Sequence, residues 1–71
     1  MKYNAEILTS DKLRLEVKDL QLITDGSFTF TEQNFKEFIL QRNNSYTFVG
    51  EDEILCTDFD NIVYVSIMKA D

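Results

Sequence analysis

An alternation of apolar and charged residues between Lys12 and Lys18 is the feature that most constrains how this chain can fold. Leu13, Leu15 and Val17 stand at every second position, and each of their neighbours is charged. Because successive side chains of a strand point to opposite faces, this period of two predicts a strand with one buried and one solvated face. The three apolar residues are expected to point inward.

The alternation changes parity just after Lys18. Asp19 occupies the next inward position, while Leu20 and Leu22 continue the pattern on the other face. Either a β-bulge near Lys18 and Asp19 or a tight turn into a new strand can produce such a slip. The bulge is the preferred interpretation, because this stretch contains no Gly or Asn to make a turn.

Asp25-Gly26 is the strongest turn signal in the chain. Gly adopts positive φ without steric cost, and Asp-Gly between β-prone segments is typical of a two-residue hairpin loop. Residues 20–23 are therefore expected to pair antiparallel with residues 27–30. Phe28 and Phe30 share one face of that strand and are expected in the core.

One amphipathic helix is predicted at about residues 32–42. The residues that share one helical face are Phe35, Phe38, Ile39 and Arg42. Their spacing is that of a helix with one side packed on a core. Thr31 is placed to cap the start of this helix, and Asn43 tolerates the left-handed conformation of a C-terminal cap.

A short β-prone segment at residues 5–9 opens the chain, and three more follow the helix, at residues 46–49, 53–57 and 62–68. The last segment begins with four consecutive apolar residues, which predicts an internal strand covered on both faces. The resulting order β-β-β-α-β-β-β predicts an α+β fold: a small antiparallel curled sheet of five to six strands with helix 32–42 packed on one face. A chain of 71 residues has room for a single domain, 1–71.

Residue composition argues against an enzyme. The chain contains no His, which is the commonest general base near neutral pH and the commonest transition-metal ligand. Cys56 has no imidazole to activate it and is interpreted as a small buried core residue. The two Gly are far apart, so they cannot form a phosphate-binding loop. We therefore expect no catalysis, no metal and no cofactor.

The net charge of −6 is concentrated in the C-terminal third, where residues 51–71 contain one Lys and six Asp or Glu. A negative field repels phosphates and anionic lipids, so neither direct nucleic-acid binding nor membrane binding is expected. No apolar run is long enough for a signal peptide or a membrane span. A lone Cys agrees with a reducing compartment, which predicts a cytoplasmic protein.

The candidate partner-binding residues are Glu51, Asp52, Glu53, Asp58, Phe59 and Asp60. Their carboxylates fall in two loops at opposite ends of one predicted strand. These loops are either solvated and solubilising, or a weak calcium site, or an imitation of nucleic-acid phosphates that fits a basic groove. Phe59 is either an exposed apolar anchor or a ring tucked over the sheet edge.

The order of the segments, with FTFTE before NFKEFILQ and NIVYVSI near the end, resembles that of small proteins of Gram-positive bacteria and their phages. This pattern contains no motif and assigns no functional residue. The leading hypothesis is a non-enzymatic acidic binding protein, a phage-type inhibitor that engages a basic, nucleic-acid-binding surface of a host protein through residues 51–71. The alternative is a structural or assembly module that self-associates, as in a homodimer, through an exposed sheet edge.

Overall fold

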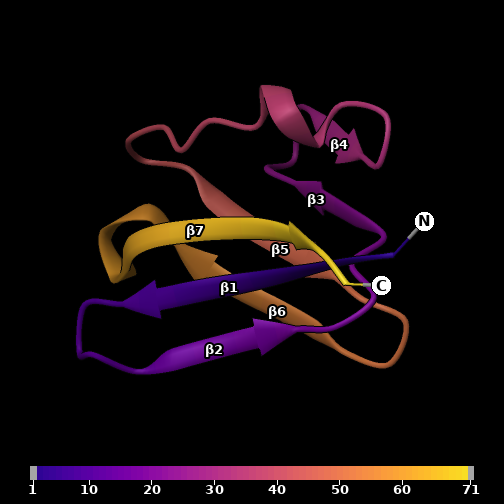
Figure 1. Ribbon diagram of the computed structural model, residues 1–71. Coiled ribbons are helices and arrows are strands. Elements are labelled where there is room, and N and C mark those ends of the chain that lie inside the picture. Colours follow the sequence, from indigo (N-terminus) through magenta and orange to yellow (C-terminus); the bar gives the residue numbers. More distant parts are fainter. Residues whose placement is uncertain (1, 71) are drawn as a thin grey trace.

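The computed structural model describes residues 2–70, and this range contains seven strands in two antiparallel sheets (Figure 1). The strands are β1 (Tyr3–Thr9), β2 (Arg14–Val17), β3 (Leu22–Thr24), β4 (Thr29–Thr31), β5 (Ser45–Val49), β6 (Ile54–Asp58) and β7 (Ile62–Lys69). Two single turns of 3-10 helix, η1 (Phe35–Glu37) and η2 (Phe59–Asn61), complete the fold. The sequence therefore folds almost entirely as β structure.

The strands form two layers, sheet A with the order β2-β1-β7 and sheet B with the order β4-β3-β5-β6. Figure 1 shows sheet A lying in front of β5 and β6. Inward side chains of both layers and of two connecting segments make one hydrophobic cluster. Its buried members are Ala5, Ile7, Val17, Leu20, Ile23, Phe35, Tyr46 and Phe48. The two sheets thus share a single core.

The strand predicted from the alternation is confirmed as β2, which pairs antiparallel with β1. Val17 is fully buried and Leu15 is half-buried, as the pattern predicts. Leu13 is 56% exposed instead, because it precedes β2 in the turn that connects β1 and β2.

Residues 18–21 carry the chain from sheet A to sheet B, so the preferred β-bulge is wrong. Asp19 has a φ of 52°, and the next strand, β3, belongs to the other sheet. The Leu20 N–H donates to the Tyr3 carbonyl at 2.6 Å, and the Gln21 N–H donates to the Val49 carbonyl at 2.7 Å. The change of parity therefore marks a crossover between layers.

The predicted hairpin is confirmed as β3 and β4, with Ile23 opposite Phe30. Its loop has four residues instead of two, because pairing stops at Thr24 and Thr29. Gly26 adopts a φ of 93°, whereas Asp25 does not have positive φ. The Asp25 carboxylate accepts hydrogen bonds from the Ser27 and Phe28 N–H groups, which closes the loop.

The predicted helix at 32–42 is wrong, and the α+β class and the single curled sheet are wrong with it. Within residues 2–70 the segment between β4 and β5 has turns at 32–34 and 42–43, the single helical turn η1, and an extended stretch at 38–41. None of the described helices could span a membrane. Phe38 and Leu40 are half-buried whereas Ile39 is 67% exposed, so burial alternates here with the period of a strand.

Local and tertiary contacts explain why this segment does not become helical. The Asn34 Oδ1 atom accepts a hydrogen bond from the Thr31 N–H at 2.6 Å, which closes a turn where the helix was expected to begin. A helix of this length is marginal without packing. The extended course places the Phe38 ring edge-on to Phe30 and Tyr46, at centroid distances of 5.3 and 5.5 Å. These aromatic contacts stabilise the extended segment.

The last strand is an edge strand, and the prediction of an internal strand is wrong. β7 pairs with β1 at the end of sheet A, with a register shift near Thr9. Val63 and Tyr64 are 59% and 37% exposed. A run of apolar residues therefore lies partly on the surface of this molecule.

Candidate functional site

The β6 edge is the side of β6 that has no neighbouring strand among the described residues. On its other side β6 pairs with β5 from Ile54 to Asp58. Alternation places Ile54, Cys56 and Asp58 on the outer face of sheet B, and all three are exposed. The β6 edge therefore offers unpaired backbone groups beside a face of mixed polarity.

The predicted carboxylates lie in two acidic turns, one at each end of β6. The first acidic turn is residues 51–53, between β5 and β6, and the second is residues 58–60, which leads through η2 into β7. Glu51, Asp52, Glu53, Asp58 and Asp60 are all exposed. A rise of about 3.3 Å per residue separates Glu53 from Asp58 by about 17 Å. The structure thus brings these residues to one edge but not into one cluster.

Two of these carboxylates, those of Glu53 and Asp58, accept hydrogen bonds from other residues of the chain. The Glu53 Oε1 atom accepts a hydrogen bond from the Lys18 N–H at 3.2 Å, which ties the first acidic turn to the crossover. The Ser45 hydroxyl donates to Asp58 Oδ1 at 2.6 Å across the β5–β6 pair. By contrast, the carboxylates of Glu51, Asp52 and Asp60 make no hydrogen bond or ion pair with another residue of the described chain.

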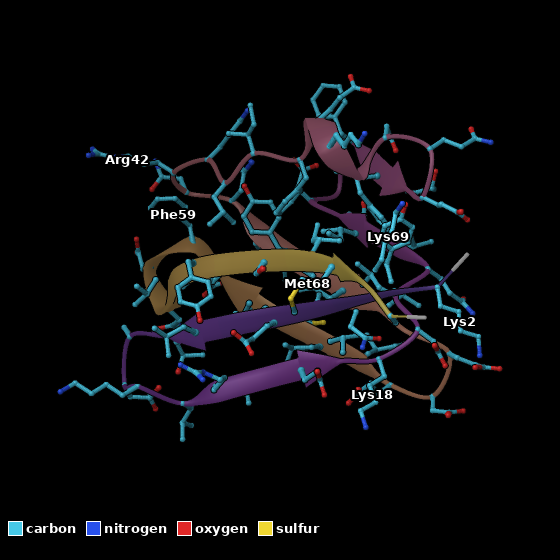
Figure 2. The ribbon with its side chains drawn as sticks, viewed as in Figure 1. Lys2, Lys18, Arg42, Phe59, Met68 and Lys69 are labelled. Atoms are coloured by element: carbon cyan, nitrogen blue, oxygen red, sulfur yellow. The ribbon has the colours of Figure 1, made fainter. Side chains whose placement is uncertain are left out.

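Phe59 is half-buried and packs against the hydrophobic cluster, so it matches the tucked alternative. Its backbone N–H donates to the Asn44 carbonyl at 2.9 Å. Figure 2 shows Phe59 at the same end of the molecule as Arg42. A shallow hollow of about 230 Å³ lies beside the ring, lined by Asn43, Asn44, Ser45, Asp58, Phe59 and Asp60. The Phe59 ring therefore anchors the second acidic turn to the hydrophobic cluster.

Cys56 is exposed, so its interpretation as a core residue is wrong. Leu55 takes the inner position opposite Phe48, which turns Cys56 to the outer face beside Thr47, at 3.6 Å between sulfur and hydroxyl oxygen. The apolar pair Ile54-Leu55 hides this parity in the sequence, because either residue can be the inward one. Ile54 is consequently a surface residue that sequence reasoning missed.

Phe28 is a second apolar residue that sequence reasoning misplaced. It was expected in the core, but it is 67% exposed at the end of the β3–β4 loop. The sequence signal for this exposure is the turn Asp25-Gly26-Ser27 directly before Phe28. Pairing stops at Thr24 and Thr29, so Phe28 lies in the loop and not in a paired strand.

Acidic residues of the described chain form no group of three or more that could hold a metal ion. In the second acidic turn, Asp58 and Asp60 flank the half-buried Phe59, and Asp58 already accepts the Ser45 hydrogen bond. The sequence feature that suggested a weak calcium site, Asp58 with Asp60 and Asn61, lies at the end of β6 and in η2.

Comparisons of the chain with protein-family models, with curated proteins and with solved structures find no match. The clearest feature of the described surface is the unpaired edge strand β6, with Ile54 67% exposed and exposed carboxylates at each end.

Proposed function

We propose that this protein is a non-catalytic binding protein that engages a basic partner through the β6 edge and the two acidic turns. The observation that carries the proposal is the placement of exposed carboxylates at both ends of an edge strand. An extended segment of a partner can add to such an edge through backbone hydrogen bonds. Basic side chains at the ends of that segment would meet opposite charge.

The specific form of this proposal is a phage-type inhibitor that occupies the basic, nucleic-acid-binding surface of a host protein. A net charge of −6 on a chain of 71 residues supports it, because such a field accelerates association with a basic surface and repels competing nucleic acid. We place the protein in the cytoplasm as part of the same proposal. Its single Cys, exposed on β6, has no second Cys with which to form an internal disulfide.

A basic peptide tests the β6 edge directly. The probe is a fluorescent peptide with five β-prone residues flanked by two Lys at each end, and binding is followed by anisotropy. The combined variant Glu51→Gln, Asp52→Asn and Asp60→Asn removes charge without touching the Glu53 or Asp58 hydrogen bonds. Because each exposed charge pair contributes up to about 1 kcal/mol, we expect affinity to fall about tenfold.

Glu16→Gln is the matched control, since Glu16 is an exposed carboxylate on β2 in the other sheet. This control should bind the peptide as the wild type does, and binding should weaken as salt rises. A peptide with Glu in place of the Lys residues should not bind. Glu16→Gln removes one charge and the combined variant removes three. An equal loss of affinity per removed charge in the two proteins would reduce the effect to net charge and contradict a site at β6.

A further inference from the structure

β7 provides the longest edge strand of the molecule, with eight residues. We call its unpaired side the β7 edge. Within residues 2–70, no backbone hydrogen bond joins residues 63–69 to a strand other than β1. The β7 edge therefore presents a row of N–H and C=O groups that another strand can satisfy.

The other three edges carry features that hinder pairing with a copy of the chain. β4 has only three residues, and β2 has four, two of them charged, Arg14 and Glu16. The β6 edge is bounded by the acidic turns. β7 combines a length of eight residues with low charge, because Ile62–Lys69 contains no Asp or Glu and a single cation, Lys69. Short length and charge normally protect sheet edges, and β7 has little of either.

We propose that β7 pairs antiparallel with β7 of a second copy about a two-fold axis at Ser66. The pairing would join the two molecules into one six-stranded sheet with the order β2-β1-β7-β7-β1-β2, in which the last three strands belong to the second copy. Tyr64 then lies opposite Met68 of the second copy on the outer face, and Val65 lies opposite Ile67. Tyr64 and Met68 are 37% and 43% exposed, and Figure 2 shows Met68 on the outer face of sheet A. Pairing covers both side chains.

Charge complementarity selects a second copy as the occupant of the β7 edge. Two-fold pairing brings Lys69 of each molecule to the end of β7 where the other molecule carries its second acidic turn. Lys69 makes no ion pair with another residue of the described chain. The same operation at β6 would set the first acidic turn of one copy beside the second acidic turn of the other. Like charges there oppose self-pairing, so the two edges are suited to different partners.

The substitution Ser66→Lys tests this interface at its two-fold axis. Ser66 lies opposite Glu6 on β1, so the introduced ammonium has a favourable neighbour within one molecule. In the dimer it would face the identical ammonium of the second copy. By sedimentation equilibrium at low micromolar to millimolar concentration we expect the wild type to approach twice 8.3 kDa and Ser66→Lys to remain near 8.3 kDa.

Ile54→Lys is the control on the β6 edge, and it should dimerise as the wild type does. Wild-type protein that stays monomeric through the millimolar range would overturn the proposal, as would a dimer that Ile54→Lys disrupts and Ser66→Lys leaves intact. Amide exchange of the wild type gives a second readout that needs no variant. The proposal requires protection of β7 amides that increases with protein concentration, and constant protection would also overturn it.

Discussion

Asp25 closes the β3–β4 loop by accepting two backbone hydrogen bonds at its Oδ1 atom, from Ser27 at 2.9 Å and Phe28 at 2.7 Å. The Phe28 N–H is the largest cause, and the Ser27 N–H the second, of a pKa for Asp25 below its ordinary value of 3.8. A folded-state pKa below the unfolded value contributes stability that is fully present above the unfolded pKa. That contribution is lost as the pH falls through the folded pKa.

Asp25→Ala should therefore melt at a lower temperature than the wild type at neutral pH, because the loop N–H groups lose their acceptor. The difference should narrow as the pH falls from about 5 to about 2, where the wild-type carboxylate becomes protonated. Melting curves of both proteins across this range measure it. A difference that stays constant with pH would show that the carboxylate charge is not the cause.

Gly50 lies where the first acidic turn approaches the crossover. A Cβ atom at this position would lie 2.5 Å from the Lys18 carbonyl oxygen and 2.8 Å from the Val17 Cγ1 atom. Because a backbone oxygen cannot move aside cheaply, Gly50→Ala should lower the free energy of unfolding by about 2–3 kcal/mol. Urea denaturation measures the loss.

Gly26→Ala is the comparison, since a Cβ there meets no atom within 4 Å but the φ of 93° remains unfavourable. Its cost should be about 1 kcal/mol. If Gly50→Ala unfolds at the wild-type urea concentration, the close approach of residues 17–18 and 50 is absent in solution.

The sequence predicted the strands but misassigned the segment between β4 and β5 as a helix. Alternation and the Asp25-Gly26 turn identify β2 and the β3–β4 hairpin because both signals are local. Residues 32–42 fit a helical stripe through Phe35, Phe38 and Ile39, but the Phe38-Ile39 pair also fits a strand. Long-range aromatic contacts decide between these patterns, and such contacts cannot be read from local spacing.

The candidate site, too, could be predicted only where it depends on local sequence signals. The two acidic turns could be placed at the ends of one strand from the sequence, because turn signals bracket that strand. Which side of β6 faces the core depends on its register with β5, and this register sets the exposure of Ile54 and Cys56. A shift of one residue exchanges the two faces, so the outer surface of the site was not predictable.

Truncations at Phe38 and Ile39 distinguish the extended segment from a helix. Phe38→Ala should lower the free energy of unfolding by about 2 kcal/mol, because the ring contacts Phe30, Tyr46 and Phe48. Ile39→Ala should cost less than about 0.5 kcal/mol, since Ile39 is 67% exposed. A helix with both residues on its buried stripe would make both substitutions costly, and chemical denaturation separates the two outcomes.

The two sheets are held together by one hydrophobic core and by the short crossover at residues 18–21. Ala5 and Ile7 of β1 belong to the same buried cluster as Tyr46 and Phe48 of β5. Neither sheet can open without exposing that shared apolar surface. Native-state amide exchange should therefore show the most protected amides of β1 and β5 opening with the same free energy. A lower opening free energy confined to one sheet would contradict a single cooperative unit.

The negative charge of the protein also affects its stability. With a net charge of −6 and exposed carboxylates at both ends of β6, the folded chain repels itself. The double variant Glu51→Gln and Asp52→Asn should therefore be more stable than the wild type at low salt, by about 0.5 kcal/mol. The difference should shrink near 1 M salt, where screening acts over about 3 Å.

Denaturation at several salt concentrations measures this effect, and it bears on the proposed function. Carboxylates that lower stability and at the same time raise affinity for the basic peptide would trade one property for the other, as functional residues commonly do. If the double variant is neither more stable nor weaker in binding, the first acidic turn contributes solubility alone. The part of the proposal that rests on that turn would then be wrong, while the β7 interface would be unaffected, because it involves neither residue.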